Sequence, residues 1–153
     1  MEFGTIEREI FVDASPEIVF EVVSSPDHLK EWWPDDASYQ PTPGSSGEIV
    51  FGDRDADGTV VPFTVVDARP PQLFSFRWTH PADQIAVEGN SLLVTFALSP
   101  SRGGTLLKMT ETGFREMGWE VAVLEHQYQD HVSGWDFYLP RLAPYVATVG
   151  VRP

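Results

Sequence analysis

Aromatic side chains are the most abundant groups in this sequence that could form a binding site. The 153 residues include ten Phe, five Trp and four Tyr. The polar group of a buried Trp or Tyr needs a hydrogen-bond partner, which a bound molecule or an ordered water can supply. The expected ligand-binding residues are those whose segments should converge on one interior: Trp32, Phe51, Phe63, Phe76, Trp78, Met109, Glu111, Tyr128, Trp135 and Tyr138. In the alternative interpretation, these rings only fill a core.

Glu111 is the member of that set that could carry a charge. By strand alternation it lies on the same face as Leu107 and Met109, so an apolar face lining a cavity would bring a carboxylate to or near the cavity wall. A carboxylate in that position needs a charged or hydrogen-bonding partner. We expect Arg8, on the inward face of the first strand, as a candidate partner. In the alternative, Glu111 lies at the strand end near Gly113 and is solvated.

Other patterns that would indicate catalysis or metal binding are missing from the sequence. There is no Cys, no Gly-x-Ser-x-Gly elbow and no glycine-rich phosphate loop. His126 and His131 are five apart, which places them on different helix faces. Asp53, Asp55 and Asp57 lack the later Glu of a calcium loop and indicate a solvated hairpin turn. We therefore predict no catalytic residue, no metal site and no cofactor.

The charge balance narrows the class of partner. With 23 acidic and ten basic residues, the formal net charge is -13. This argues against nucleic acid and against an anionic membrane surface, both of which need Lys and Arg. The sequence has no signal-peptide pattern at its start and no apolar run of about 18 residues that could span a bilayer. We expect a cytoplasmic protein.

The first third of the chain predicts a strand followed by two short helices. Residues 6–12 alternate in the manner of a strand. Ser15 can cap a helix whose first residue is Pro16. Ser25 and Pro26 can begin a second helix in the same way, and Pro34 ends it.

The middle of the chain, residues 39–114, predicts consecutive antiparallel strands joined mostly by short turns. The clearest is 73–79, where Phe74, Phe76 and Trp78 share one face. Gly103 and Gly104 indicate a hairpin turn. Residues 81–90 form the longest irregular connection, which could gate a cavity at one end of the sheet.

The last third predicts one long amphipathic helix with a kink or irregular turns at Pro140 and Pro144. Its apolar stripe steps by three or four residues: Leu124, Tyr128, Val132, Trp135, Leu139, Leu142 and Val146. This helix is the only predicted element long enough to cover the apolar face of the sheet. We predict an α+β helix-grip fold in one domain, 1–153, with a curved antiparallel sheet of six or seven strands around the C-terminal helix.

Several segments, in this order along nearly the whole chain, resemble the START-like (SRPBCC) proteins. More narrowly, they resemble the branch named after the activator of the heat-shock protein 90 ATPase. The segments are 10–23, 25–34, 47–51, 57–63, 70–78, 103–114 and 131–139. The resemblance implies the helix-grip fold, which carries lipid carriers, hormone receptors, cyclases and chaperone regulators. It also implies a chaperone as an alternative partner.

The function predicted from these observations is non-catalytic binding of a small, largely hydrophobic molecule between the C-terminal helix and the sheet. One alternative is regulation of the heat-shock protein 90 ATPase. The other is a polyketide cyclase-like or hydrolase-like enzyme in which Glu111, Tyr128 or Tyr138 moves protons. We expect a monomer or a homodimer.

Overall fold

The computed structural model describes residues 3–150 and confirms the predicted helix-grip fold. The strands are β1 (Thr5–Val12), β2 (Asp36–Ser38), β3 (Ser46–Phe51), β4 (Thr59–Arg69), β5 (Leu73–Trp78), β6 (Leu92–Ser101) and β7 (Gly104–Thr112). They form one antiparallel sheet of seven strands in the order β1-β7-β6-β5-β4-β3-β2. The edge strand β2 has only three residues, which is too short to show the alternation of side chains by which a strand is predicted.

Two short helices follow β1, as predicted: α1 (Pro16–Ser24) and α2 (Pro26–Trp32). The side chain of Ser15 accepts a hydrogen bond from the Ile18 amide at the start of α1. Ser25 begins α2 through its backbone conformation, without a side-chain hydrogen bond. Trp33 follows α2 with a non-helical backbone, so its ring points in a direction that helical geometry does not give.

The hairpin between β6 and β7 closes through Arg102 and Gly103, whose φ angles are 53° and 82°. Both residues are left-handed, as a two-residue hairpin loop with the twist of the sheet requires. Between β4 and β5 the pairing register shifts at Val65 and Asp67, and such a β-bulge bends the strand that carries it.

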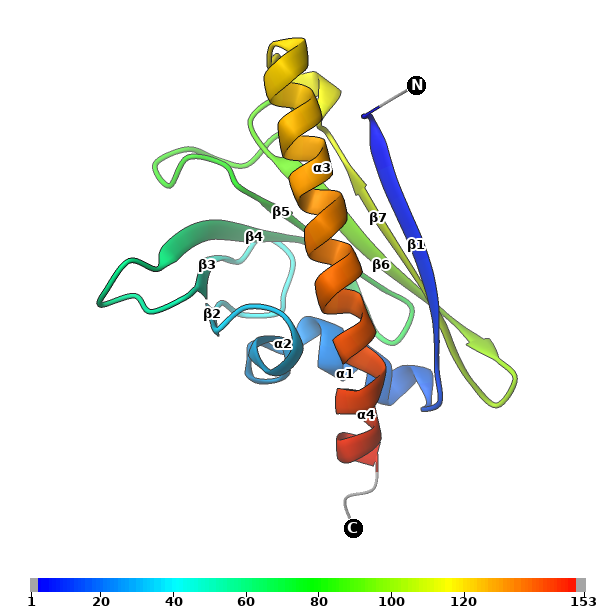
Figure 1. Ribbon diagram of the computed structural model, residues 1–153. Helices are drawn as coiled ribbons and strands as arrows, with labels where there is room; N and C mark the ends of the chain where they lie inside the picture. The colour runs from blue at the N-terminus through cyan, green and yellow to red at the C-terminus, as the bar shows by residue number, and fades with distance from the viewer. Residues whose placement is uncertain (1–2, 151–153) are drawn as a thin grey trace.

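The C-terminal helix lies across one face of the sheet (Figure 1). It consists of α3 (Val121–Tyr138), a 3-10 turn (Leu139–Arg141) and α4 (Leu142–Gly150). Pro140 lies in the 3-10 turn, which confirms the irregularity predicted there. A second 3-10 turn, Arg115–Met117, precedes α3. Figure 1 shows α1 and α2 at the same end of the sheet as α4.

The core between the helices and the sheet is built mainly from rings. Phe63, Phe74, Phe76 and Phe96 are fully buried, and each such side chain contributes about 1.5–3 kcal/mol through its removal from water. Tyr39 donates a 2.7 Å hydrogen bond to the carbonyl of Ser24, and burial raises its pKa. Within residues 3–150, no helix is both long and apolar enough to cross a membrane.

Candidate functional site

A pocket of about 500 Å³ opens between α3 and the strands β3, β4 and β5. Most of its wall is aromatic or aliphatic. The lining residues are Trp33, Phe51, Val61, Trp78, Thr79, Asp130, His131, Ser133, Gly134, Trp135, Phe137 and Tyr138. The pocket therefore lies where the fold predicts it, with one wall from the helix and the other from the sheet and the end of α2.

Trp33 is the ring around which this wall is built. Its centroid lies 4.9 Å from that of Trp135, 5.0 Å from that of Trp78 and 6.0 Å from that of Phe51. The three contacts come from α3, β5 and β3. Because ring pairs at such separations add to the stabilisation from burial, they hold the pocket wall in one arrangement.

Helical spacing explains why α3 presents a continuous surface to the pocket. His131, Trp135 and Tyr138 are four and three residues apart and share one face. Gly134 lies in the same wall, and a Cβ added there would meet nothing within 4 Å. The helix thus leaves open space where most residues would place a side chain.

Glu111 is completely buried directly behind the aromatic wall. The indole N–H of Trp78 donates to Oε2 at 2.7 Å, and that of Trp135 donates to Oε1 at 2.8 Å. Nδ1 of His131 lies 3.0 Å from both oxygens. A buried carboxylate is stable only when hydrogen bonds replace its hydration, and here side chains of β5 and α3 supply them.

The donors around Glu111 also fix the proton on the histidine. An indole N–H can only donate, so both carboxylate oxygens act as acceptors. A neutral His131 satisfies the remaining contact when Nδ1 carries the proton and donates to the same carboxylate. This tautomer leaves the lone pair on Nε2, to which no described residue hydrogen-bonds.

The structure corrects the expected partner of Glu111. Arg8 is half-exposed and bonds to Asp136 on α3, with Nε 2.8 Å from Oδ1. This hydrogen bond raises the pKa of Arg8 and lowers that of Asp136. The alternative of a solvated Glu111 is also wrong, because the helix covers this end of β7 and leaves the carboxylate no access to water.

The structure distributes the other expected binding residues between the pocket and the core. Phe51, Trp78, Trp135 and Tyr138 line the pocket. Trp32, Phe63, Phe76 and Met109 are fully buried in the hydrophobic core.

Tyr128 lies further along α3, where its hydroxyl donates to the Thr5 carbonyl and its ring packs on Phe114. Tyr128 therefore fastens the helix to β1. The indole N–H groups of Trp32, Trp78 and Trp135 all bond within the protein, so a ligand is not needed to satisfy them.

Sequence reasoning overlooked Trp33, His131 and Gly134. Trp32 and Trp33 lie three and four residues after Leu29, so helical spacing does not separate them. Trp33 follows the end of α2 with a non-helical backbone, which the sequence did not reveal, and it escaped selection. His131 lies four residues before Trp135, on the apolar stripe of α3. That position, together with a buried Glu that needed a donor, was the available signal.

Thr79 adds a strained residue to the pocket wall. Its φ is 68°, which a β-branched residue rarely adopts, and its hydroxyl is buried with no hydrogen-bond partner among residues 3–150. Such strain is concentrated at functional sites.

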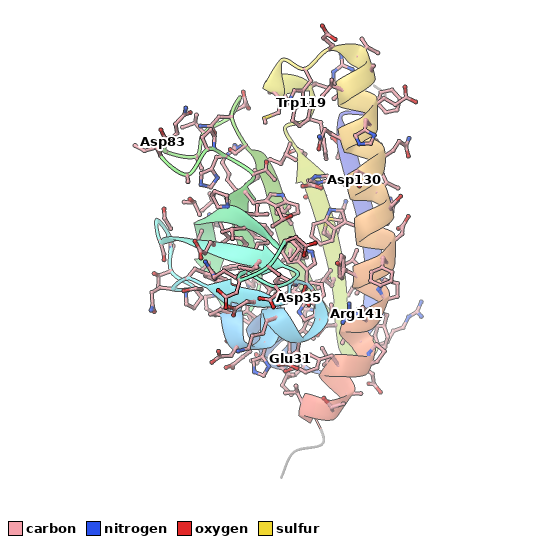
Figure 2. All side chains as sticks on the ribbon, turned by 60° about the vertical axis from the view of Figure 1, so that its left-hand side comes forward. Glu31, Asp35, Asp83, Trp119, Asp130 and Arg141 are labelled. Atoms are coloured by element: carbon pink, nitrogen blue, oxygen red, sulfur yellow. The ribbon has the colours of Figure 1, made fainter. Side chains whose placement is uncertain are left out.

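The acidic side chains near the pocket are few. Asp130 of α3 belongs to the pocket lining, whereas Asp83 projects away from α3 in Figure 2. None of residues 81–90 belongs to the pocket lining, so the predicted gating loop does not form part of this wall. Across residues 3–150, no three His, Asp or Glu side chains gather as a metal site would require.

Comparison with known proteins supports the architecture. Residues 13–147 match the family described as activator of Hsp90 ATPase homolog 1-like protein. No curated protein sequence matches the chain. Protein MLL2253 from Mesorhizobium loti is similar in structure, with a TM-score of 0.72 and 21% identity over 94% of this chain and 97% of that chain.

Two further structures have the same fold. The Aha1 dimer from Colwellia psychrerythraea gives a TM-score of 0.66 and 21% identity, over 93% of this chain and 95% of that chain. DynU16, from the dynemicin biosynthetic locus, gives 0.71 and 22% identity, over 96% of this chain but 48% of that chain. At these identities the likeness establishes the fold.

Proposed function

The chain belongs to the family of activator of Hsp90 ATPase homolog 1-like proteins, and from that premise we propose that it binds a small, largely apolar molecule without transforming it. The observation that carries the proposal is the pocket of about 500 Å³ walled by aromatic rings between α3 and the sheet. We place this activity in the cytoplasm.

The size and chemistry of the pocket suit such a molecule. Sites for small molecules commonly enclose about 300–1,000 Å³ and combine an apolar wall with a few placed polar groups. Here Trp33, Trp78 and Trp135 provide flat apolar surface, and His131 provides a polar atom. A flat ring can stack on such walls with little change in the protein.

The wall is also held in place before any ligand arrives. Trp78 and Trp135 are each fixed by a hydrogen bond to the same buried carboxylate, so neither ring is free to collapse into the pocket. Preorganisation of this kind preserves affinity, because ordering side chains on binding costs about 0.5–1.5 kcal/mol for each one.

A neutral fluorescent probe tests the proposal. N-phenyl-1-naphthylamine becomes bright in apolar surroundings, so its titration should give a saturable rise with one site per chain. The same probe should raise the melting temperature, because a ligand that binds only the native state stabilises it. If no saturable signal and no thermal shift appear for this probe or for a panel of planar aromatic molecules, the proposal is wrong.

Regulation of a chaperone ATPase is a second candidate, favoured by the family description and by the fold shared with the Aha1 dimer. It predicts binding to heat-shock protein 90 at micromolar concentration and a changed ATPase rate. If the chain neither binds heat-shock protein 90 nor changes its ATPase rate, this second candidate is wrong.

A further inference from the structure

We propose that the Glu111–His131 pair is a hydrogen-bond acceptor site in the pocket wall, and that the ligand is a neutral planar aromatic molecule whose hydroxyl group donates to Nε2 of His131. This inference rests on the proposed binding function and names the class of ligand. It gives a role to a buried carboxylate for which sequence reasoning expected Arg8 as the partner, and to a histidine that it set aside.

The first argument is orientation. The carboxylate of Glu111 is held by three side chains, so neither its position nor its rotation is free. Nδ1 of His131 is hydrogen-bonded to that carboxylate, and this contact fixes both the tilt of the ring and its tautomer. A carboxylate behind a histidine also makes the opposite nitrogen a better acceptor.

The second argument is access. The side chain of His131 is 11% exposed, and the residue belongs to the pocket lining. Nε2 has no hydrogen-bond partner among the described residues. Unlike the hydroxyl oxygen of Thr79, it is not fully buried. Nε2 therefore offers an unused lone pair to a molecule in the pocket, and such a molecule needs an O–H or N–H to use it.

The third argument is charge. Within the described lining, Asp130 is the only carboxylate and His131 is the only basic side chain. The lining contains no Lys or Arg. The chain as a whole has a net charge of -13. Arg141 lies over the rings of Phe137 and Tyr138 but is not one of the lining residues. A carboxylate or phosphate ligand beside His131 would therefore meet no cationic side chain of the described lining and would be repelled by Asp130, so the favoured donor is a neutral hydroxyl group.

The fourth argument is shape. The ring centroids of Trp78 and Phe114 lie 5.2 Å and 5.4 Å from that of His131, and of these two only Trp78 lines the pocket. Trp135, one helical turn along α3, is a further ring of the lining. A planar aromatic ring can stack beside them while its hydroxyl reaches the imidazole. A phenolic hydroxyl is a stronger donor than an aliphatic one, which suits an acceptor that a carboxylate has already polarised.

Calorimetric titration with matched naphthalenes tests the inference. 2-Naphthol should bind about tenfold more tightly than 2-methoxynaphthalene, which keeps the ring and the oxygen but cannot donate; tenfold corresponds to ~1.4 kcal/mol. In His131→Phe the preference should vanish while 2-methoxynaphthalene still binds. His126→Phe, an exposed position on the same helix, is the matched control and should retain the preference.

The outcomes separate the two proposals. If neither naphthalene binds the wild type although N-phenyl-1-naphthylamine does, the acceptor site is wrong and the binding function stands. If none of the three molecules binds, both proposals are wrong. If both bind equally, or if the preference persists in His131→Phe, the acceptor site is wrong and the binding function stands.

A second measurement does not depend on the folding of a variant. Long-range proton–nitrogen spectra of the wild type should show the proton of His131 on Nδ1, the nitrogen that contacts Glu111. A proton on Nε2 instead would overturn the inference.

Discussion

The indole nitrogen of Trp135 lies 2.8 Å from Oε1 of Glu111, and this hydrogen bond joins the pocket wall to a carboxylate that is fully buried. Trp78 makes the equivalent bond to the other oxygen from the opposite side of the pocket. The carboxylate thus connects α3 with β5 through the two rings. Structure and binding are coupled at this point, because the carboxylate that fixes the rings of Trp78 and Trp135 also orients His131.

Replacement of Glu111 should destabilise the protein strongly. Glu111→Gln places an amide NH₂ where an oxygen accepts, so one indole N–H faces a donor and loses its partner. We expect a loss of about 2–4 kcal/mol in the free energy of unfolding, measured by urea denaturation. Glu125→Gln, exposed on the same helix, is the control and should change stability by less than about 0.5 kcal/mol. Equal midpoints for the two variants would contradict the assigned hydrogen bonds.

The Arg8–Asp136 pair should contribute little to stability. Both side chains are substantially exposed, and pairs of this kind are worth about 0–1 kcal/mol. Arg8→Ala should therefore have a small effect that shrinks further at high salt.

Combined with Glu111→Gln, Arg8→Ala should also give additive losses within about 0.5 kcal/mol, since the two residues share no hydrogen bond. A coupling energy well above that value would revive Arg8 as a partner of Glu111.

His80 should make stability fall as the solution becomes acidic. Burial lowers the pKa of His80, whereas the unfolded chain keeps a value of about 6.5. Below that pH the unfolded state binds more protons than the folded state, so the free energy of unfolding decreases as pH drops towards the folded pKa. The neutral, buried His80 makes its full contribution to the free energy of unfolding above about pH 6.5.

The test compares denaturation of the wild type and His80→Gln between about pH 7 and 5. Glutamine can still bond to the Thr64 hydroxyl, which is the partner of Nε2, and it does not titrate. The variant should show a shallower decline. An identical slope in the two proteins would contradict the lowered pKa of His80.

Gly134→Ala should stabilise the protein. Gly134 lies inside α3, and an added Cβ meets nothing within 4 Å. Alanine is favoured over glycine by about 0.8–1.0 kcal/mol in a helix interior, so the denaturation midpoint should rise. A lower midpoint would show that the space beside Gly134 is not open.

The fold was predictable because its signals are local and repeated. Alternation in residues 73–79, proline and serine at both short helices, and the stripe from Leu124 to Val146 each indicate one element. β2 was not predictable, because a three-residue edge strand has no period.

The site was only partly predictable because it depends on long-range contacts. Phe51, Trp78, Trp135 and Tyr138 were selected by residue type and segment. Trp33 required knowledge of how the chain leaves α2, and the bond from His131 to Glu111 joins residues in different elements, 20 positions apart. Arg8 was misassigned because a strand face does not say which helix residue meets it, and that residue is Asp136.

Binding of N-phenyl-1-naphthylamine to Gly134→Leu tests the central claim most directly. A leucine at this position points into the open space of the pocket and should fill part of it without disturbing the packed core. Gln129→Leu, exposed on α3 and outside the lining, is the matched control. We predict saturable binding by the wild type and the control, and at least tenfold weaker binding by Gly134→Leu with its melting temperature preserved. Equal affinity in all three proteins would contradict the assignment of this pocket as the binding site.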